Sequence, residues 1–363
     1  MGRKLKLGAT LCAALLAGSA FGAQAAAPAG GAPAGPPRQP APKQLQLVKD
    51  NIYRANNGNW WSLVVVTKDG IIIADPINPT HAAWLKNELA TRFPGKPVKY
   101  VIYSHSHWDH IEGGAVFADT AQFVAQEGVL KNLDGRYPHM PGDMIDRNND
   151  GQIELEDIMV PTNAHPGICG MSEAFFKGKD KDGDGKITPG DFYDRVPKPT
   201  ITYSERMTLT LGGETLQLIF PGKNHADDGT VIYFPAEKVV YSTDFPADAL
   251  VGQSMRSLPS ACGAFDEHPM SEWIKSYKTI EALDFDILAQ GHGAVMFKKQ
   301  DVTEGREYFE YLRDQVSGAM SKGMSLDEMR RTLMLEPYKG WAFYERLRVM
   351  NIEAAYNNLR TYK

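Results

Sequence analysis

The sequence has few cysteines, no stretch rich in basic residues and only one long apolar run, which lies at its start. Only 3 of its 363 residues are cysteines, which excludes a scaffold held together by many disulfides. Because no Lys- or Arg-rich stripe is present, we expect no nucleic-acid binding. Beyond residue 25 no segment approaches the roughly 20 apolar residues of a membrane span, so we expect none in the mature chain. Nothing in the sequence specifies an oligomeric state.

The first 43 residues divide into two segments that we expect to lie outside the folded domain. Residues 1–25 combine a basic start, an apolar stretch and a small-residue end, the pattern of a cleaved signal peptide. We therefore expect a periplasmic or secreted protein. Residues 26–43 are rich in Ala, Pro and Gly and predict a disordered linker. In an oxidising compartment Cys169 and Cys262 could form a disulfide, and the sequence leaves the paired and unpaired states open.

The densest group of metal-binding side chains is residues 104–110, Ser-His-Ser-His-Trp-Asp-His, directly after an apolar run. Imidazole and carboxylate are ligands that suit zinc. His105 and His107 alternate and can reach one side of an extended segment, whereas Asp109 and His110 point elsewhere as the chain turns. One short loop can therefore supply two neighbouring metal ions. The alternative is a polar turn with chance histidines, and three of the chain's 9 histidines within six positions argue against it.

Three further candidate ligands follow short β-like runs, where sheet proteins collect their sites. They are His225, Asp244 and His292. Glycines close to the two histidines permit tight turns that can aim the imidazoles inward. Asp75 ends another β-like run, and it could either support the histidine loop or form an ordinary turn before the next proline.

The motif His-x-His-x-Asp-His, complete in residues 105–110, resembles the metallo-β-lactamase-fold hydrolase superfamily. The resemblance covers about residues 45–132 and 200–300. It implies an α/β fold, a four-layer αββα sandwich. It also implies two zinc ions, with iron or manganese as alternatives. One ion would be held by His105, His107 and His225, and the other by Asp109, His110 and His292. Asp244 would bridge the two ions.

The stretch between the two halves of this resemblance is an acidic insertion, residues 134–199. It holds two segments that resemble EF-hand calcium loops, with oxygen-bearing side chains at positions 1, 3 and 5, Gly at 6 and Ile at 8. The two isoleucines can pair as a short β-bridge. Position 12 is Asp where Glu is usual, which favours a modest calcium affinity, and an acidic surface loop without metal is the alternative. The predicted calcium ligands are Asp146, Asn148, Asp150, Gln152 and Asp157 in the first loop, and Asp180, Asp182, Asp184, Lys186 and Asp191 in the second, with Gln152 and Lys186 acting through their backbone carbonyls.

These features predict an exported binuclear zinc hydrolase that acts on a small-molecule substrate. By the resemblance, a metal-bound hydroxide would attack an ester, thioester, lactone or related bond, with Asp109 orienting it as the catalytic side chain. A metallo-β-lactamase is one alternative, but lactamases of this family usually have Cys or Ser at the place of Asp244. A mononuclear iron oxidoreductase of the persulfide dioxygenase type and a calcium-dependent binding protein are two others. Trp60, Trp61 and Trp108 could line the substrate site or pack in the core.

The predicted domain plan follows from these segments. A core over residues 44–300 is interrupted by the insertion at 134–199, and helices fill residues 301–363. Apolar residues spaced three and four apart around Phe309 and Leu312 predict one buried helical face. Ser325 and Glu328 form a capping box that opens the next helix.

Overall fold

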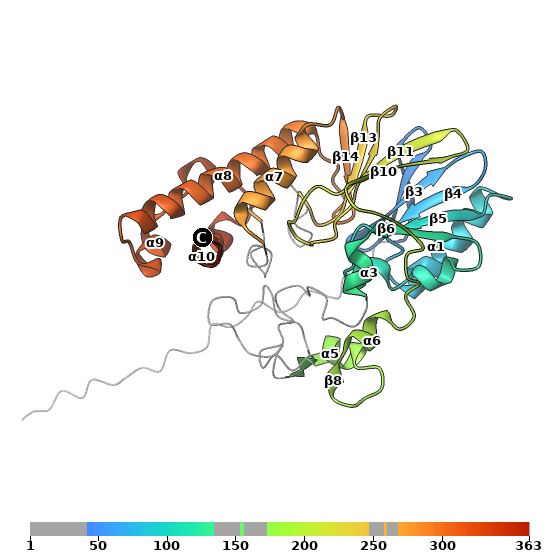
Figure 1. Cartoon of the computed structure of the whole chain (residues 1–363), viewed down its shortest axis with the longest axis horizontal. Coiled ribbons are helices and arrows are strands. Elements are labelled where there is room, and N and C mark those ends of the chain that lie inside the picture. The colour runs from blue at the N-terminus through green and yellow to red at the C-terminus, as the bar shows by residue number, and fades with distance from the viewer. Residues whose placement is uncertain (1–41, 134–152, 156–172, 247–257, 260–267, 363) are drawn as a thin grey trace, which may run out of the picture. The chain divides into compact units, whose positions relative to one another are not determined.

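The computed structural model describes residues 42–133, 153–155, 173–246, 258–259 and 268–362 (Figure 1). The predicted signal peptide, nearly all of the predicted linker and both Cys169 and Cys262 lie outside these residues. So do the first acidic loop's ligands Asp146, Asn148, Asp150, Gln152 and Asp157. Among the described residues, no helix combines the length and the apolar character that crossing a bilayer requires.

Seven strands form the first sheet, in the order β1-β2-β3-β4-β5-β6-β9. The first four strands pair antiparallel, and β5, β6 and β9 continue the sheet in parallel. Residues 67–70 join β3 to β4. The strands are β1 (Leu45–Lys49), β2 (Ile52–Asn57), β3 (Trp60–Val66), β4 (Ile71–Ala74), β5 (Val98–Ile102), β6 (Gln122–Gln126) and β9 (Ile201–Tyr203).

The second sheet has five strands in the order β10-β11-β12-β13-β14, antiparallel except for the last pair. They are β10 (Arg206–Leu211), β11 (Glu214–Ile219), β12 (Val231–Phe234), β13 (Val239–Ser242) and β14 (Ile287–Gln290). The sequence predicts one strand over residues 200–210, but the structure divides it. The exposed Ser204 and Glu205 form a bend there, so β9 joins the first sheet and β10 starts the second.

The period-two alternation of the strands separates the two faces of each sheet. In β3, Leu63 and Val65 belong to a buried cluster shared with Leu216 and Ile232 of the second sheet. Val64, between them, belongs instead to the cluster on the opposite face, together with residues of α1 (Pro79–Arg92) and α3 (Gly128–Asn132). Helices therefore cover the outer face of the first sheet, and the two sheets pack face to face (Figure 1).

The outer face of the second sheet packs against the C-terminal helices. Val240 and Leu288 share a buried cluster with α7 (Met270–Glu281), α8 (Lys299–Ser321) and α10 (Tyr344–Thr361). Phe309 and Leu312 are buried as the spacing predicts. The predicted capping box opens α9 (Leu326–Thr332), where Ser325 Oγ accepts from the Glu328 N–H. The four layers α, β, β and α match the fold class predicted from the sequence.

Short elements complete the described chain. Helix α1 starts at Pro79, where the Asn78 side chain caps it by accepting from the His81 N–H. The remaining elements are α2 (Trp108–Ile111), η1 (Gly114–Phe117), β7 (Ile153–Glu154), α5 (Glu173–Lys179), β8 (Lys186–Ile187), α6 (Pro189–Tyr193) and η2 (Glu336–Tyr338).

Candidate metal centre

The seven predicted zinc ligands all lie on segments that directly follow strands, five on loops and two in a short helix. The loop after β5 holds His105 and His107 and leads into α2, whose first turn carries Asp109 and His110. The other three come from the second sheet: His225 follows β11, Asp244 follows β13 and His292 follows β14. The structure brings these side chains together in two adjoining groups.

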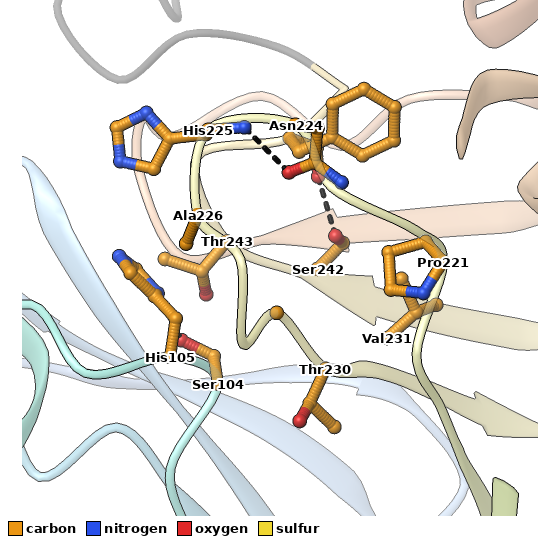
Figure 2. Close-up of a pocket in the computed structure, with 12 residues that line it drawn as sticks. Ser104, His105, Pro221, Asn224, His225, Ala226, Thr230, Val231, Ser242 and Thr243 are labelled. Atoms are coloured by element: carbon orange, nitrogen blue, oxygen red, sulfur yellow. Dashed lines mark hydrogen bonds between the residues drawn. The ribbon is translucent and has the colours of Figure 1, made fainter. Parts of the chain in front are cut away.

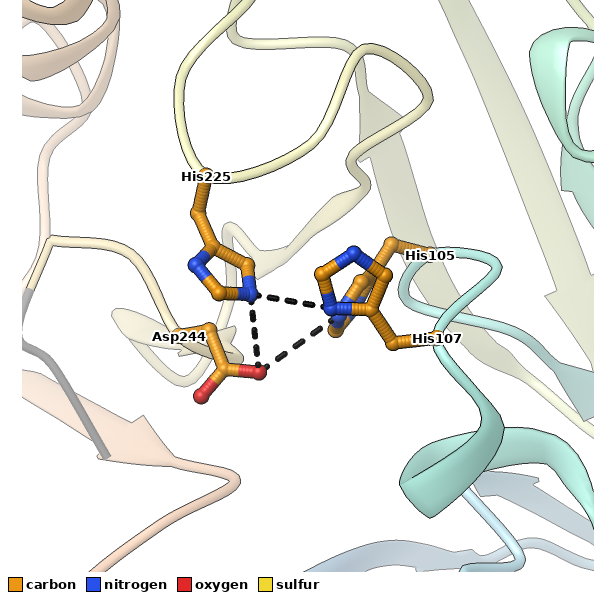
Figure 3. Close-up of side chains that lie close together, drawn as sticks. All are labelled: His105, His107, His225 and Asp244. Carbon is orange, nitrogen blue, oxygen red and sulfur yellow. Dashed lines mark hydrogen bonds and ion pairs between the residues drawn. The ribbon is translucent and has the colours of Figure 1, made fainter. Parts of the chain in front are cut away.

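The first group consists of His105, His107, His225 and Asp244, whose ligand atoms all lie within 4.8 Å of one another (Figure 3). His225 Nε2 is 3.0 Å from His107 Nδ1. Asp244 Oδ2 is 3.4 Å from His105 Nε2 and 3.5 Å from His225 Nε2. His105 Nε2 is buried and has no hydrogen-bond partner. Three imidazoles and one carboxylate, with a buried nitrogen that lacks a hydrogen-bond partner, are a donor set that would suit zinc.

The second group consists of Asp109, His110 and His292. His110 Nε2 lies 3.1 Å from His292 Nε2 and 3.3 Å from Asp109 Oδ2. Asp244 also reaches this group, because its Oδ2 is 3.0 Å from His110 Nε2 and its Oδ1 is 3.1 Å from His292 Nε2. Asp244 therefore contacts both groups, as a bridging ligand would.

Burial and charge prepare these side chains for metal binding. Burial, together with the neighbouring His225, lowers the pKa of His107 to about 3, and burial also holds the pKa of His105 well below its usual value. Both imidazoles are therefore neutral near pH 7, the form that binds a metal. Burial alone would lower the pKa of His110, but Asp109 and Asp244 outweigh it and raise that pKa well above its usual value. A cation can replace the proton that these carboxylates attract.

The histidine loop is held by groups that are not themselves ligands. Ser104 Oγ lies 2.9 Å from His105 Nδ1, which leaves His105 Nε2 facing the first group. Asp228, fully buried, accepts from the Ser106 N–H at 3.3 Å and from the Asn132 side chain at 2.9 Å. Burial raises the pKa of the Asp228 carboxyl. These contacts give Asp228 a supporting role.

Asp75 is the buried acid behind the loop. Its Oδ1 accepts from the Ser104 N–H at 2.9 Å, and its Oδ2 accepts from the hydroxyls of Tyr241 at 3.0 Å and Thr243 at 2.7 Å. Tyr241 lies in β13, and Thr243 directly precedes Asp244. Asp75 thus ties the histidine loop of the first sheet to the Asp244 segment of the second. Of the two readings that the sequence left open for Asp75, the supporting role is confirmed.

The loop that carries His225 is also fixed locally, beside a small pocket (Figure 2). Asn224 Oδ1 accepts from the His225 N–H at 2.7 Å, and Asn224 Nδ2 donates to the Gly222 carbonyl at 3.0 Å. Gly222 has φ +112, a conformation that L side chains rarely adopt. The pocket opens beside His105 and His225, and Pro221, Val231 and Thr243 also line it.

The supporting role of two residues, Arg54 and Trp60, was not predicted from the sequence. Arg54 is fully buried in β2 and donates to the carbonyl oxygens of Gln290 at 3.2 Å and Ala294 at 2.8 Å, so it holds the loop of His292. Trp60 donates its indole N–H to Asp109 Oδ2 at 2.9 Å. A charged residue inside a β-like run was the available signal for Arg54. For Trp60 no local pattern existed.

The other two tryptophans pack rather than line the metal groups. Trp61 is buried, and the Arg54 guanidinium lies 4.3 Å from its ring centre. Trp108 lies under the Lys179 ammonium, at 3.7 Å, and 5.8 Å from the Phe192 ring. Lys179 and Phe192 both belong to the insertion, so Trp108 is a contact between the insertion and α2.

The second acidic loop gathers three of its predicted ligands. Carboxylate oxygens of Asp180, Asp182 and Asp184 lie within 4.8 Å of one another. Lys186 lies in β8, where Ile187 pairs antiparallel with Ile153, as predicted for the two position-8 isoleucines. Asp191 is not in the group. Its carboxylate instead caps α6 by accepting from the Thr188 N–H at 2.8 Å.

The sequence and the fold of this chain resemble those of known proteins. The chain matches the metallo-beta-lactamase superfamily over residues 56–292. It belongs to this superfamily. The match spans every predicted zinc ligand, from the histidine loop of the first sheet to His292 after the last strand.

Curated relatives of the chain include three enzymes. It is 23% identical to the 2,4-dinitroanisole O-demethylase subunit alpha of a Nocardioides species, over 68% of this chain and 56% of that protein. It is 21% identical to a linear primary-alkylsulfatase of a Pseudomonas species, over 76% of this chain and 50% of that protein. It is 22% identical to an alkyl/aryl-sulfatase of Saccharomyces cerevisiae, over 80% of this chain and 44% of that protein. The chain spans about half the length of these relatives.

One solved structure supports the fold. A stereoselective inverting sec-alkylsulfatase from a Pseudomonas species superposes with a TM-score of 0.58 at 16% sequence identity, covering 88% of this chain and 51% of that one. At this identity the likeness extends to the fold alone.

Proposed function

We propose that this protein is a binuclear zinc-dependent hydrolase whose substrate is a small molecule with an ester-type bond. The observation that carries the proposal is the position of Asp244, which contacts ligand atoms of both groups at 3.0 to 3.5 Å. A single carboxylate between two three-residue sets fits two metal ions better than one. The second set, Asp109, His110 and His292, would be redundant in a mononuclear iron enzyme.

The chain's own residues supply the remaining functions. Bound zinc would contribute Lewis acidity and lower the pKa of a water molecule from near 16 to roughly 7. Asp109, half-buried at the edge of the second group, would orient that water and accept its proton. Asp75 and Asp228 hold the histidine loop from behind, so its imidazoles need no rearrangement.

Sulfate esters are the substrate class that the relatives favour. The Pseudomonas and Saccharomyces relatives are named as alkylsulfatases or alkyl/aryl-sulfatases. An aryl methyl ether, which is not an ester, is the alternative to this proposal, because another relative is named as an O-demethylase. Carboxylic esters, thioesters and lactones remain in the proposal as other bonds open to the same chemistry. A β-lactam is disfavoured by Asp244.

A substrate panel tests the proposal directly. The purified zinc protein is assayed against alkyl and aryl sulfates, 2,4-dinitroanisole, carboxylic esters, thioesters, lactones and a β-lactam. We expect turnover of a sulfate ester or another ester-type substrate, and a loss of at least 100-fold in kcat for Asp109→Ala, in the range that an essential acid–base group contributes. Wild-type rates for Asp109→Ala would reject Asp109 as the orienting group. Oxygen consumption with a persulfide, without hydrolysis, would reject the hydrolase.

Two further proposals concern the rest of the chain. The second acidic loop, with Asp180, Asp182 and Asp184 close together, is proposed to bind calcium with a structural or regulatory role. Its support is the grouped carboxylates and the paired isoleucines of β7 and β8. Export to a periplasm or to the medium is proposed from the sequence of residues 1–25 alone.

A further inference from the structure

The second ligand group contains a carboxylate whose orientation is fixed by few contacts. Asp109 sits in the first turn of the four-residue helix α2, and 17% of its side chain is exposed. Its Oδ2 lies 3.3 Å from His110 Nε2 and 3.9 Å from His292 Nε2. Both nitrogens are themselves candidate ligands, so metal binding would take their lone pairs and end any hydrogen bond to Asp109.

Trp60 provides the contact that metal binding leaves intact. Its Nε1–H donates to Asp109 Oδ2 at 2.9 Å. Among the hydrogen bonds of the described residues, this is the one in which Asp109 accepts from a side chain outside the ligand set. An indole N–H is a donor only and has no lone pair to offer a metal. It can therefore hold the carboxylate with or without zinc.

The backbone around Trp60 is paired with the loop of His292. Trp60 and His292 form an isolated antiparallel bridge, in which the Trp61 N–H donates to the Gly291 carbonyl at 2.7 Å. The Gly293 N–H donates to the Asn59 carbonyl at 2.8 Å. The ring of Trp60 lies 5.4 Å from that of His292. One residue thus contacts two of the three side chains in the second group.

We propose that Trp60 is a positioning residue that orients Asp109 as a ligand of the second metal ion. The inference rests on the proposed two-metal function. Its indole fixes the carboxylate of Asp109 in α2 through Oδ2, while its backbone pairs with His292 in the loop after β14. Supporting partners of this kind alter metal affinity or activity by about 10- to 100-fold when they are removed.

The test is stepwise zinc titration of Trp60→Phe, which keeps an aromatic ring and removes the N–H. We expect first-site affinity within about twofold of wild type and second-site affinity weakened by roughly tenfold. The matched control is Trp84→Phe, a half-buried tryptophan on α1 beside His81, which should retain both affinities. Equal second-site affinities in Trp60→Phe and wild type would overturn the inference.

A double-mutant cycle separates orientation of Asp109 from general support of the His292 loop. If the indole acts through Asp109, Trp60→Phe should cause no further loss of second-site affinity when introduced into Asp109→Ala. A loss as large as in the wild-type background would show that Trp60 acts through His292 and would reject the role proposed here. A wild-type protein that binds a single zinc ion would instead refute the two-metal function on which the inference rests.

Discussion

At the scale of single residues, the candidate site depends on buried polar groups that each have a defined partner. The grouping of the candidate ligands could be predicted, because imidazole and carboxylate side chains directly after β-like runs are a local pattern. The supporting residues could not be predicted, and the sequence left the role of Asp75 undecided. Arg54 lies 236 residues from the Gln290 carbonyl to which it donates. No spacing rule connects positions that far apart, so only the packed sheets show that Arg54 holds the His292 loop.

His81 shows how a buried histidine outside the metal groups affects stability. It is fully buried, its Nε2 lies 3.0 Å from Ser62 Oγ, and burial, aided by Lys43, lowers its pKa to about 3. In the unfolded chain its pKa is near 6.5. Between these pH values the His81 imidazole is protonated in the unfolded state and neutral in the folded state. The free energy of unfolding therefore falls as the pH drops from about 6.5 towards 3.

The variant His81→Gln cannot take up this proton. We therefore expect the free energy of unfolding of the wild type to fall by up to about 1.4 kcal/mol per pH unit more steeply than that of the variant below pH 6.5. Urea unfolding at pH 7, 6 and 5, with a chelator present so that both proteins are metal-free, measures the two slopes. Parallel slopes would show that His81 keeps an ordinary pKa in the folded protein.

At the scale of elements, the insertion is joined to the helix that carries two of the predicted ligands. Lys179, the last residue of α5, forms an ion pair with Glu112 at 2.7 Å and lies over the Trp108 ring. Trp108 is the first residue of α2 and Glu112 is its C-cap. This helix holds Asp109 and His110. Lys179 directly precedes Asp180, the first residue of the acidic loop. The pattern of that loop was visible in the sequence, whereas its connection to α2 follows only from the packing.

Calcium binding by the second acidic loop has a measurable consequence. Because ligands that bind only the folded state stabilise it, we expect millimolar calcium to raise the Tm of the full-length wild-type protein by a few degrees. Asp182→Ala removes one exposed carboxylate of the group and should reduce this shift. Asp194→Ala, an exposed acid outside the group, is the control and should keep the full shift. The same Tm with calcium and with chelator in the wild type would refute the calcium site.

At the scale of the whole molecule, the site is shared between the two sheets. The first sheet supplies the histidine loop and α2, and the second supplies His225, Asp244 and His292. The resemblance carried by the motif of residues 105–110 was enough to predict both sheets and the helical layers. It did not predict that residues 200–210 divide between the sheets, since a two-residue bend leaves the apolar pattern almost unchanged. Neither sheet holds a complete ligand set, so metal binding is expected to stabilise the packing of one sheet on the other.

The zinc content of the purified protein, measured by elemental analysis after saturation with zinc and removal of free metal, tests the central claim most directly. The account predicts two zinc ions per chain in the wild type and in His81→Gln, and one in His292→Ala, which keeps the first group complete. A wild type with one zinc ion or none, or two tightly held ions in His292→Ala, would contradict the two-metal centre.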